Sequence, residues 1–209
     1  MKLYIVRHGE TEMNTKGALQ GWSNGPLNKN GRDLAVITGR AMKGIVFDEC
    51  ITSPLIRSKE TVEIILRESG NSSVPVFTDD RIREIGFGDL EDSLVADLGD
   101  LGLRFLKDPF RVERFPKGEC VKDVCERTQS FLRELIARDD GKTYLIGSHG
   151  CAVRAMFNFL YEDPSNFWQG SVPLNCSVNI LTAEHGEIVS FEHDKIYYDA
   201  SLIEDHYKM

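Results

Sequence analysis

The N-terminal segment 2–11 constrains the fold more tightly than any other part of the chain. An apolar, β-branched run, Leu3–Val6, ends abruptly in Arg7, His8 and Gly9. A continuous apolar run of this length is typical of a short strand that is covered on both faces. In open α/β sheets, ligands bind in the crevice outside the carboxyl ends of the strands. The segment therefore predicts a buried strand that presents a cation and a titratable nucleophile at one edge of a sheet.

A second segment of the same design surrounds Arg57. The strand-like run 48–52 is followed by Ser53 and Pro54, which predict a helix with serine as N-cap and proline at the first helical position. Arg57 then lies in the first turn, where free N–H groups and the helix dipole favour anions. The alternative role of Arg57 is an ordinary surface pair with Glu60.

A third segment of this kind ends at His149. The predicted strand 142–147 is followed by Ser148 and Gly150 around this histidine, at the start of the predicted helix 151–161. On its own, His149 is equally well explained as the cap of that helix. If the three strand ends meet at one edge of a sheet, one cationic pocket forms from Arg7, His8, Arg57 and His149.

The remaining pattern alternates strands and helices. Helical spacing of apolar residues predicts helices from Asn28 or Gly31 to Lys43, from Ser53 to Gly70, and over 118–138. Alternating runs at 175–183 and 188–193 predict a terminal hairpin. This order favours a three-layer α/β/α sandwich on a mostly parallel mixed sheet. The length suits a single domain, 1–209, with a charged, irregular insert or lid at about 89–117.

Composition narrows the function classes. The net charge is −8, which argues against nucleic acid as a partner and requires a local cationic pocket for any anionic substrate. No stretch is long and apolar enough for a membrane span, and the N-terminal run is too short for a signal peptide. The odd cysteine count and the lack of a Cys-x-x-Cys pair favour reduced thiols. We therefore expect a cytoplasmic protein.

Short motifs follow one another in order along most of the chain. They are Arg7-His8-Gly9-Glu10-Thr11 with Asn14, Leu19-Gln20-Gly21-Trp22, Pro26-Leu27 with Gly31, Ser53-Pro54-Leu55 with Arg57-Ser58, Arg83-Glu84 with Gly86 to Gly88, Gly118-Glu119, and Ser148-His149-Gly150. In this set and spacing the chain resembles the histidine phosphatase superfamily, in its phosphoglycerate mutase-like branch. The resemblance implies a phosphoglycerate mutase-like fold and phosphoryl chemistry on a small phosphorylated substrate without a cofactor.

The chemistry of phosphoryl transfer gives the cationic residues distinct roles. A neutral imidazole is a good nucleophile near neutral pH, so His8 is the candidate that forms a phosphohistidine. Guanidinium groups match phosphate oxygens bidentately, which suits Arg7 and Arg57. His149 adds a further donor to the same oxygens. The competing interpretation of an isolated His8 is a satisfied core histidine.

The resemblance also implies an acid and additional contacts. A glutamate at the place of Glu84 protonates the leaving oxygen and later activates water. Asn14 and the turn at Gln20 and Gly21 match additional phosphate and substrate contacts. Alternatives for the acid are Glu91 and Glu119. A metal site made of the two histidines and this glutamate is disfavoured, because no two of them share helical ligand spacing and arginines accompany the histidines.

Three functions remain open at this stage. Hydrolysis of a phosphomonoester comes first, because the chain lacks the longer inserts associated with bisphosphoglycerate-dependent mutases. Mutase-type transfer comes second, and a catalytically weak module that binds phosphorylated ligands or a protein comes third. Five basic residues of the insert suit either a second acidic group of the substrate or, as we favour, a solvated face: Arg104, Lys107, Arg111, Arg114 and Lys117. The family's Trp-Glu-Gly pattern is replaced by Leu90-Glu91-Asp92. A homodimer is left open, and His185, His193 and His206 belong to no motif and are expected on the surface.

Overall fold

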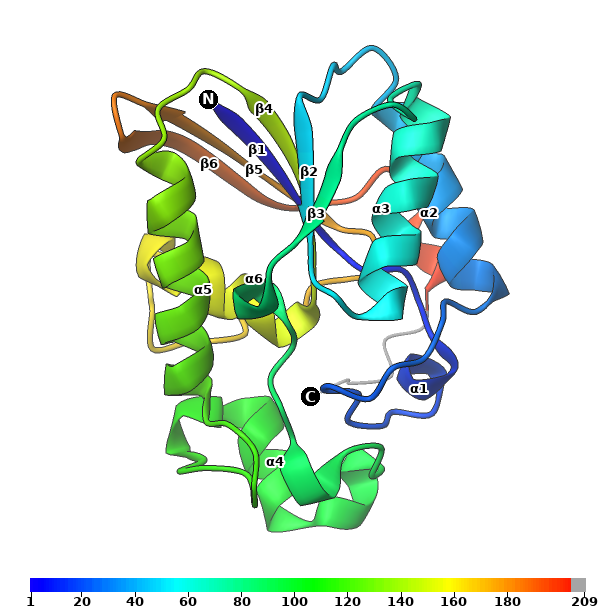
Figure 1. The fold of residues 1–209 in the computed structure, drawn as a ribbon. Helices are drawn as coiled ribbons and strands as arrows, with labels where there is room; N and C mark the ends of the chain where they lie inside the picture. The colour runs from blue at the N-terminus through cyan, green and yellow to red at the C-terminus, as the bar shows by residue number, and fades with distance from the viewer. Residues whose placement is uncertain (204–209) are drawn as a thin grey trace.

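A six-stranded mixed sheet forms the centre of the molecule (Figure 1). A computed structural model describes residues 1–203. The strand order is β3-β2-β4-β1-β5-β6. The strands are β1 (Lys2–Arg7), β2 (Glu49–Thr52), β3 (Val76–Thr78), β4 (Thr143–Ser148), β5 (Val178–Glu184) and β6 (Glu187–Lys195). The first four in the sheet order pair in parallel, and β5 runs antiparallel to β1 and to β6, which confirms the predicted mixed sheet.

Helices cover both faces of this sheet, which gives the predicted three layers. The helices are α1 (Glu12–Thr15), α2 (Lys29–Ala41), α3 (Ile56–Ser69), α4 (Asp100–Lys107), α5 (Val121–Ile136) and α6 (Gly150–Phe157). Figure 1 shows α2 and α3 together on one side of the sheet and α5 and α6 on the other. No helix among the described residues is long and apolar enough to cross a membrane.

The side-chain alternation of β1 explains why the strand is buried on both faces. Leu3 and Ile5 pack with the apolar side chains of α5 and α6, while Tyr4 and Val6 pack with those of α3. All four side chains are buried. Successive residues of a strand point to opposite faces, so one short apolar run contributes to two separate cores. This is the two-sided burial that the continuous run predicted.

The start of α3 differs from the prediction. The helix begins at Ile56 with Leu55 as N-cap and no capping side chain, so Ser53 is not the N-cap. The Ser53 hydroxyl instead lies 2.8 Å from Nε2 of His149. The same oxygen also accepts from the Leu55 N–H at 3.4 Å, so Ser53 and Pro54 both precede the first helical residue. Gly70 ends α3 in the left-handed conformation, as its position after the last apolar residue predicted.

Two glycines allow the loop after β1 to lie against the first turn of α2. A Cβ on Gly9 would lie 2.5 Å from the Gly31 carbonyl oxygen, and a Cβ on Gly31 would lie 2.2 Å from the Glu10 carbonyl oxygen. Neither distance is compatible with a side chain, so both positions require glycine. The close neighbour of Gly9 is thus the α2 backbone.

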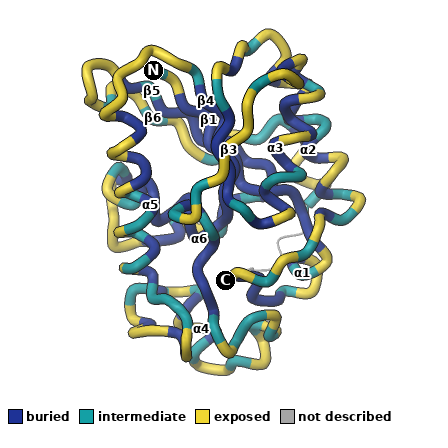
Figure 2. Tube along the Cα trace, viewed as in Figure 1, coloured by how far each residue is buried: buried dark blue, intermediate teal, exposed yellow. Residues whose placement is uncertain are grey.

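The segment 89–117 forms a small helical layer beyond the sheet, around α4 and the 3₁₀ turns Val95–Leu98 and Pro109–Arg111 (Figure 1). Its buried side chains, Phe105, Val112 and Phe115, join a core with residues of α5, α6 and the 161–175 loop. Figure 2 shows that most of its outer trace is exposed or intermediate. The five cysteines are free thiols.

Candidate active site

The ends of β1 and β4 lie side by side and deliver the first site residues. Arg7 pairs in register with Ser148, and the His8 N–H donates to the Ser148 carbonyl at 3.0 Å. Both Arg7 and His8 are buried, and the Arg7 guanidinium donates to the Pro173 carbonyl. The parallel register therefore fixes His8 beside the loop that carries His149.

The His8 imidazole has a defined tautomer. Its Nδ1 lies 2.7 Å from the Gly9 carbonyl oxygen, which can only accept a hydrogen bond. Nδ1 therefore carries the proton, and Nε2 keeps its lone pair. Burial, with the positive charges of Arg57 and Arg7, holds the pKa of His8 well below 6.5. The ring is a neutral imidazole with an unprotonated Nε2 at neutral pH.

His149 lies against His8 with ring centroids 5.1 Å apart. Its backbone occupies the N-cap position of α6, but its side chain makes no capping hydrogen bond, so the capping alternative is wrong for this side chain. Nε2 contacts the Ser53 hydroxyl, and the buried Nδ1 has no partner among the described residues. Burial and the charge of Arg57 hold the pKa of His149 well below 6.5.

Arg57 lies in the first turn of α3 and is completely buried. Its guanidinium donates to three carbonyl oxygens of one loop, those of Gln20, Gly21 and Ser23, at 2.7–3.1 Å. Glu60, its alternative partner, instead accepts from the Leu27 N–H and from Arg32. The structure thus brings Arg57 to the site through the 20–23 loop, and its positive charge acts on both histidines.

Glu91 organises that same loop from the other side. Its carboxylate accepts from the backbone N–H groups of Gly21, Trp22, Ser23 and Phe87 at 2.9–3.1 Å. Glu91 was predicted as an alternative acid. Its observed contacts are with backbone donors, and they connect the start of the 89–117 segment to the loop that holds Arg57. The feature of the sequence that singles out Glu91 is its place in the Leu90-Glu91-Asp92 stretch, which replaces the family's Trp-Glu-Gly pattern.

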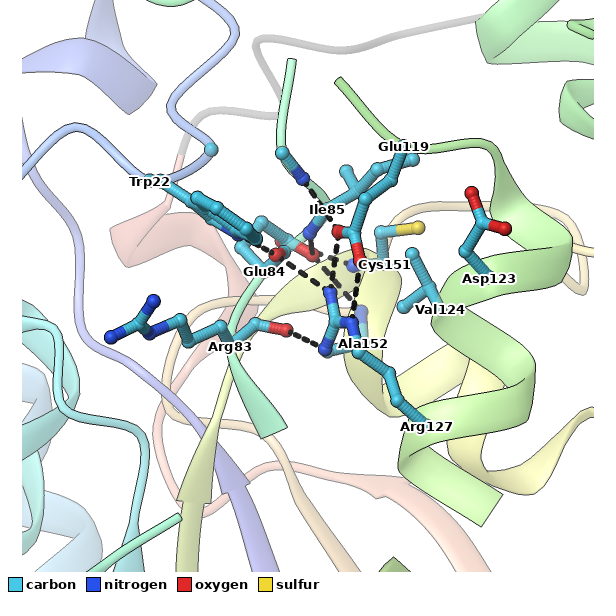
Figure 3. Close-up of polar contacts among 12 residues, drawn as sticks. Trp22, Arg83, Glu84, Ile85, Glu119, Asp123, Val124, Arg127, Cys151 and Ala152 are labelled. Carbon is cyan, nitrogen blue, oxygen red and sulfur yellow. Dashed lines mark hydrogen bonds and ion pairs between the residues drawn. The ribbon is translucent and has the colours of Figure 1, made fainter. Parts of the chain in front are cut away.

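Glu84 is the glutamate that the fold places at the pocket. It is buried, and its carboxylate oxygens accept from the N–H groups of Ile85, Cys151 and Ala152 at 3.0–3.1 Å. The last two donors belong to the first turn of α6, whose free N–H groups suit an anion. Figure 3 shows these contacts at the start of the helix. Of the candidate acids, Glu84 has both pocket exposure and a fixed orientation.

Arg127 of α5 holds the irregular segment 81–86, which carries Glu84 (Figure 3). It donates to the carbonyl oxygens of Arg81, Arg83 and Glu84 at 2.7–2.9 Å and pairs with Glu119 at 2.8 Å. Glu119 in turn accepts from the Gly86 N–H. Glu119 therefore orients the backbone beside Glu84. Arg127 belongs to none of the motifs found in the sequence.

Asn14 and Gln20 reach the same pocket from the loop after β1. The Thr11 hydroxyl donates to Oε1 of Gln20 at 2.6 Å, and the Asn14 Oδ1 accepts from the Thr11 N–H at 3.1 Å. Asn175 donates to the His8 carbonyl and to Oδ1 of Asn14. These bonds fix both predicted contact residues beside His8.

A cavity that is partly open to solvent collects these groups. Its polar lining consists of Arg7, His8, Asn14, Gln20 and Glu84. Arg57, His149 and Gly21 lie behind this lining and act on it through the contacts above. The rest of the lining is mostly apolar and was not predicted: Ala18, Leu19, Phe87, Val95, Phe105, Leu106, Gly150, Cys151, Trp168 and Val172.

His185, His193 and the basic residues of the 89–117 segment lie outside the pocket lining. In the described part of the chain, no group of three or more His, Cys, Asp or Glu side chains is arranged to hold a metal ion. The His185 side chain is almost fully exposed and His193 is half exposed beside Asp194, whereas His206 lies outside the described residues.

The fold and the site define an α/β protein with a buried, neutral histidine at a parallel strand end. The family model of the histidine phosphatase superfamily (branch 1) matches residues 3–193. The chain belongs to this superfamily, and a match over this length confirms the resemblance inferred from the motifs.

Relatives by sequence are named as mutases. A 2,3-bisphosphoglycerate-dependent phosphoglycerate mutase of Methylobacterium sp. (strain 4-46) is 34% identical over 164 residues, which cover 74% of this chain and 77% of the relative. A probable phosphoglycerate mutase GpmB of Serratia proteamaculans (strain 568) is 30% identical over 98% of both chains.

Similar solved structures confirm the fold. YhfR of Bacillus stearothermophilus superposes with a TM-score of 0.84 at 28% identity, over 94% of this chain and 98% of that one. A phosphoglycerate mutase of Bacillus anthracis superposes with a TM-score of 0.81 at 22% identity, over 99% and 96%. The phosphoglycerate mutase-like α/β fold that the sequence predicted is therefore confirmed, and the protein belongs to a family of phosphatases and mutases.

Proposed function

We propose that this protein hydrolyses small phosphomonoesters through a phosphohistidine intermediate on His8. The observation that carries the proposal is the hydrogen bond from Nδ1 of His8 to the Gly9 carbonyl. Because this bond places the proton on Nδ1, the Nε2 lone pair is available to attack phosphorus. The depressed pKa of His8 keeps the ring neutral at physiological pH.

The first step forms the bond between Nε2 and phosphorus and breaks the bond between phosphorus and the ester oxygen. Arg7 and Asn14 line the pocket beside His8, and the charge of Arg57 and the His149 ring lie behind it, so negative charge on the transferring group meets positive potential. The leaving alkoxide takes a proton from the Glu84 carboxyl group. The alcohol then departs.

The second step returns the enzyme to its starting state. Water attacks phosphorus and gives its proton to the Glu84 carboxylate, while the bond between nitrogen and phosphorus breaks. Inorganic phosphate leaves, and His8 is again neutral. We assign both proton transfers to Glu84 because its carboxylate lines the pocket in a fixed orientation. The three backbone N–H donors stabilise the carboxylate form, which accepts the proton from water.

Phosphoglycerate mutase-type transfer is the second candidate, and the names of the relatives favour it. A mutase needs to hold a second anionic group of the substrate and to return the phosphoryl group to bound product. Among the described lining residues, Arg7 is the sole arginine or lysine. This lining supports hydrolysis as the first candidate.

The test measures hydrolysis of p-nitrophenyl phosphate by the native chain, by His8→Ala and by the control His185→Ala, with and without a chelator. We expect activity that survives the chelator, persists in the control and falls by at least about 10⁴-fold in His8→Ala. Rapid acid-free quenching with a labelled substrate should trap phosphate on the native chain and on the control alone. Full activity or full labelling of His8→Ala would refute the phosphohistidine route.

Separate assays distinguish the two candidates. A phosphatase releases inorganic phosphate from its substrates whether or not 2,3-bisphosphoglycerate is present. A mutase interconverts 3-phosphoglycerate and 2-phosphoglycerate faster than it releases phosphate, and it depends on the bisphosphate. Interconversion that exceeds phosphate release would replace the hydrolase proposal with the mutase.

A further inference from the structure

One part of the pocket lining, which we call the wall, is aromatic and aliphatic. It is built by α4 and the 3₁₀ turn before it, by the 161–175 loop and by Phe87. Phe105 meets Phe87 at 5.5 Å and Trp168 at 5.6 Å between ring centroids, both edge to face. Such contacts fix the rings in one arrangement, so the wall is a preformed surface.

The single polar atom of the Trp168 side chain is already used by the protein. Its Nε1 donates to the Phe105 carbonyl oxygen at 3.0 Å. The indole therefore offers a ligand its carbon surface. Val95, Leu106 and Val172 add aliphatic side chains to the same lining, and each of them is partly buried.

The basic side chains of the 89–117 segment do not reach the wall. Lys117 pairs with Asp89 at 3.0 Å, Arg111 with Asp108 at 2.8 Å, and Arg114 with Asp123 at 2.8 Å. Arg104 and Lys107 are exposed and do not line the pocket. A carboxylate or second phosphate placed against the wall would lose its hydration without gaining a partner there, which is unfavourable.

We propose that this pocket selects phosphomonoesters whose organic group is apolar, alkyl or aryl, over those that carry a second anionic group. The inference rests on the proposed phosphatase function and names its substrate class. The polar lining at the end of β1 takes the phosphoryl group. The wall of Phe87, Val95, Phe105, Leu106 and Trp168 takes the organic group.

The first measurement uses unactivated alkyl esters, whose leaving groups differ little in chemical reactivity. Along methyl, butyl and hexyl phosphate we expect kcat/KM to rise by about fourfold for each methylene buried against the wall. We expect 3-phosphoglycerate to be at least about tenfold poorer than butyl phosphate. Hydrolysis of all esters at one rate would overturn the substrate class while leaving the phosphatase proposal intact.

A binding measurement keeps the inference testable if no ester is turned over. Alkylphosphonates have no ester bond to cleave, and their affinities can be measured by calorimetry. Hexylphosphonate should bind more tightly than methylphosphonate, and butylphosphonate more tightly than the nearly isosteric 3-phosphonopropionate. The reverse order for the second pair would show that an anion is preferred at the wall.

Two matched variants locate the effect on the wall. Leu106→Lys puts a cation into the pocket, whereas Leu103→Lys makes the same change one turn earlier on the exposed face of α4. We expect Leu106→Lys to lower the ratio of hexyl to methyl phosphate kcat/KM by about tenfold or more and to improve 3-phosphonopropionate binding. Leu103→Lys should keep the native ratio. Equal ratios in both variants would overturn the assignment of the wall.

Discussion

The two sides of the pocket are built by opposite physical means. At the end of β1, polar and charged side chains are buried and each is held by backbone groups: His8 by Gly9, Arg57 by the 20–23 loop, and Glu84 by α6. On the wall, Phe105 and Trp168 are held by ring contacts and by the burial of carbon surface. The first side fixes charges, and the second fixes a shape.

This difference suggests that the polar side sets the rate of the reaction and that the wall sets the preference among substrates. Under the proposed function, the backbone-held charges act on the phosphoryl group that every substrate shares, so loss of one of them should slow all substrates alike. The wall meets the organic group, so a change there should alter the choice among substrates. The predictions below test this separation, beginning with the largest expected effect.

Replacement of the candidate acid should slow every ester. Glu84→Gln keeps the shape of the side chain but removes the proton transfer, so we expect kcat to fall by about 10²–10⁴-fold for methyl and hexyl phosphate alike. The measurement is kcat from steady-state kinetics at several pH values. The control is Glu187→Gln at an exposed position. A loss confined to the methyl ester would assign Glu84 to substrate binding.

Replacement of Glu91, which holds the 20–23 loop, should weaken phosphate binding through Arg57, which donates to the same loop. Glu91→Ala leaves four backbone N–H groups without their acceptor, which costs about 1–3 kcal/mol for a group left unsatisfied. We expect inorganic phosphate to inhibit the variant about 5- to 100-fold less tightly, with the hexyl to methyl ratio unchanged. Circular dichroism confirms folding, and Asp97→Ala in the same segment is the control. A changed ratio with native phosphate inhibition would place Glu91 in the wall.

The two buried histidines should make the protein less stable in acid. Their pKa values are lowered on folding, so the unfolded chain binds more protons once the pH falls below about 6.5. The free energy of unfolding is therefore expected to be fully retained above this pH and to decrease as the pH falls below it. Urea titrations from pH 7.5 to 5 measure the slope, which should flatten in His8→Gln. A slope unchanged in both His8→Gln and His149→Gln would contradict the assigned pKa shifts.

The surface cations of the 89–117 segment should matter least. Lys117 and Asp89 are both largely exposed, so their ion pair contributes little. Lys117→Ala should leave the free energy of unfolding within about 0.5 kcal/mol of the native value and leave kcat/KM for 3-phosphoglycerate unchanged. A selective loss of activity on 3-phosphoglycerate would show that these cations bind the second anionic group of the substrate.

The sequence predicted the sheet and the polar side of the pocket because both depend on local patterns. The run Leu3–Val6 is apolar at every position, and its two faces enter two cores as a doubly covered strand does. A motif at a strand end implies its own location, since the carboxyl ends of parallel strands meet at one edge. Arg7 and His8 accordingly line one cavity, and Glu84, which was assigned from the family resemblance, joins them there.

Contacts between distant segments decided the features that the sequence did not predict. Ser53 was predicted to cap α3, but the helix begins at Ile56, and the Ser53 hydroxyl contacts His149 of a distant segment. The roles of Glu91 and Arg127 could not be predicted from their sequence neighbours, because most of their partners are backbone groups of distant segments. A hydrogen bond to a backbone N–H or carbonyl depends on position and not on the identity of the partner residue.

The chain by itself thus determined its family and its layered α/β fold, and it predicted which reactive side chains follow the strands, because strand periodicity and residue types are local features of the sequence. Only the tertiary structure decided the apolar wall, in which Phe87, Phe105 and Trp168 come from three separate segments. It also decided that the cations of the 89–117 segment face solvent or their own acidic partners. The physical reason is that burial of apolar surface is non-directional, so which rings meet is settled by packing of the whole chain.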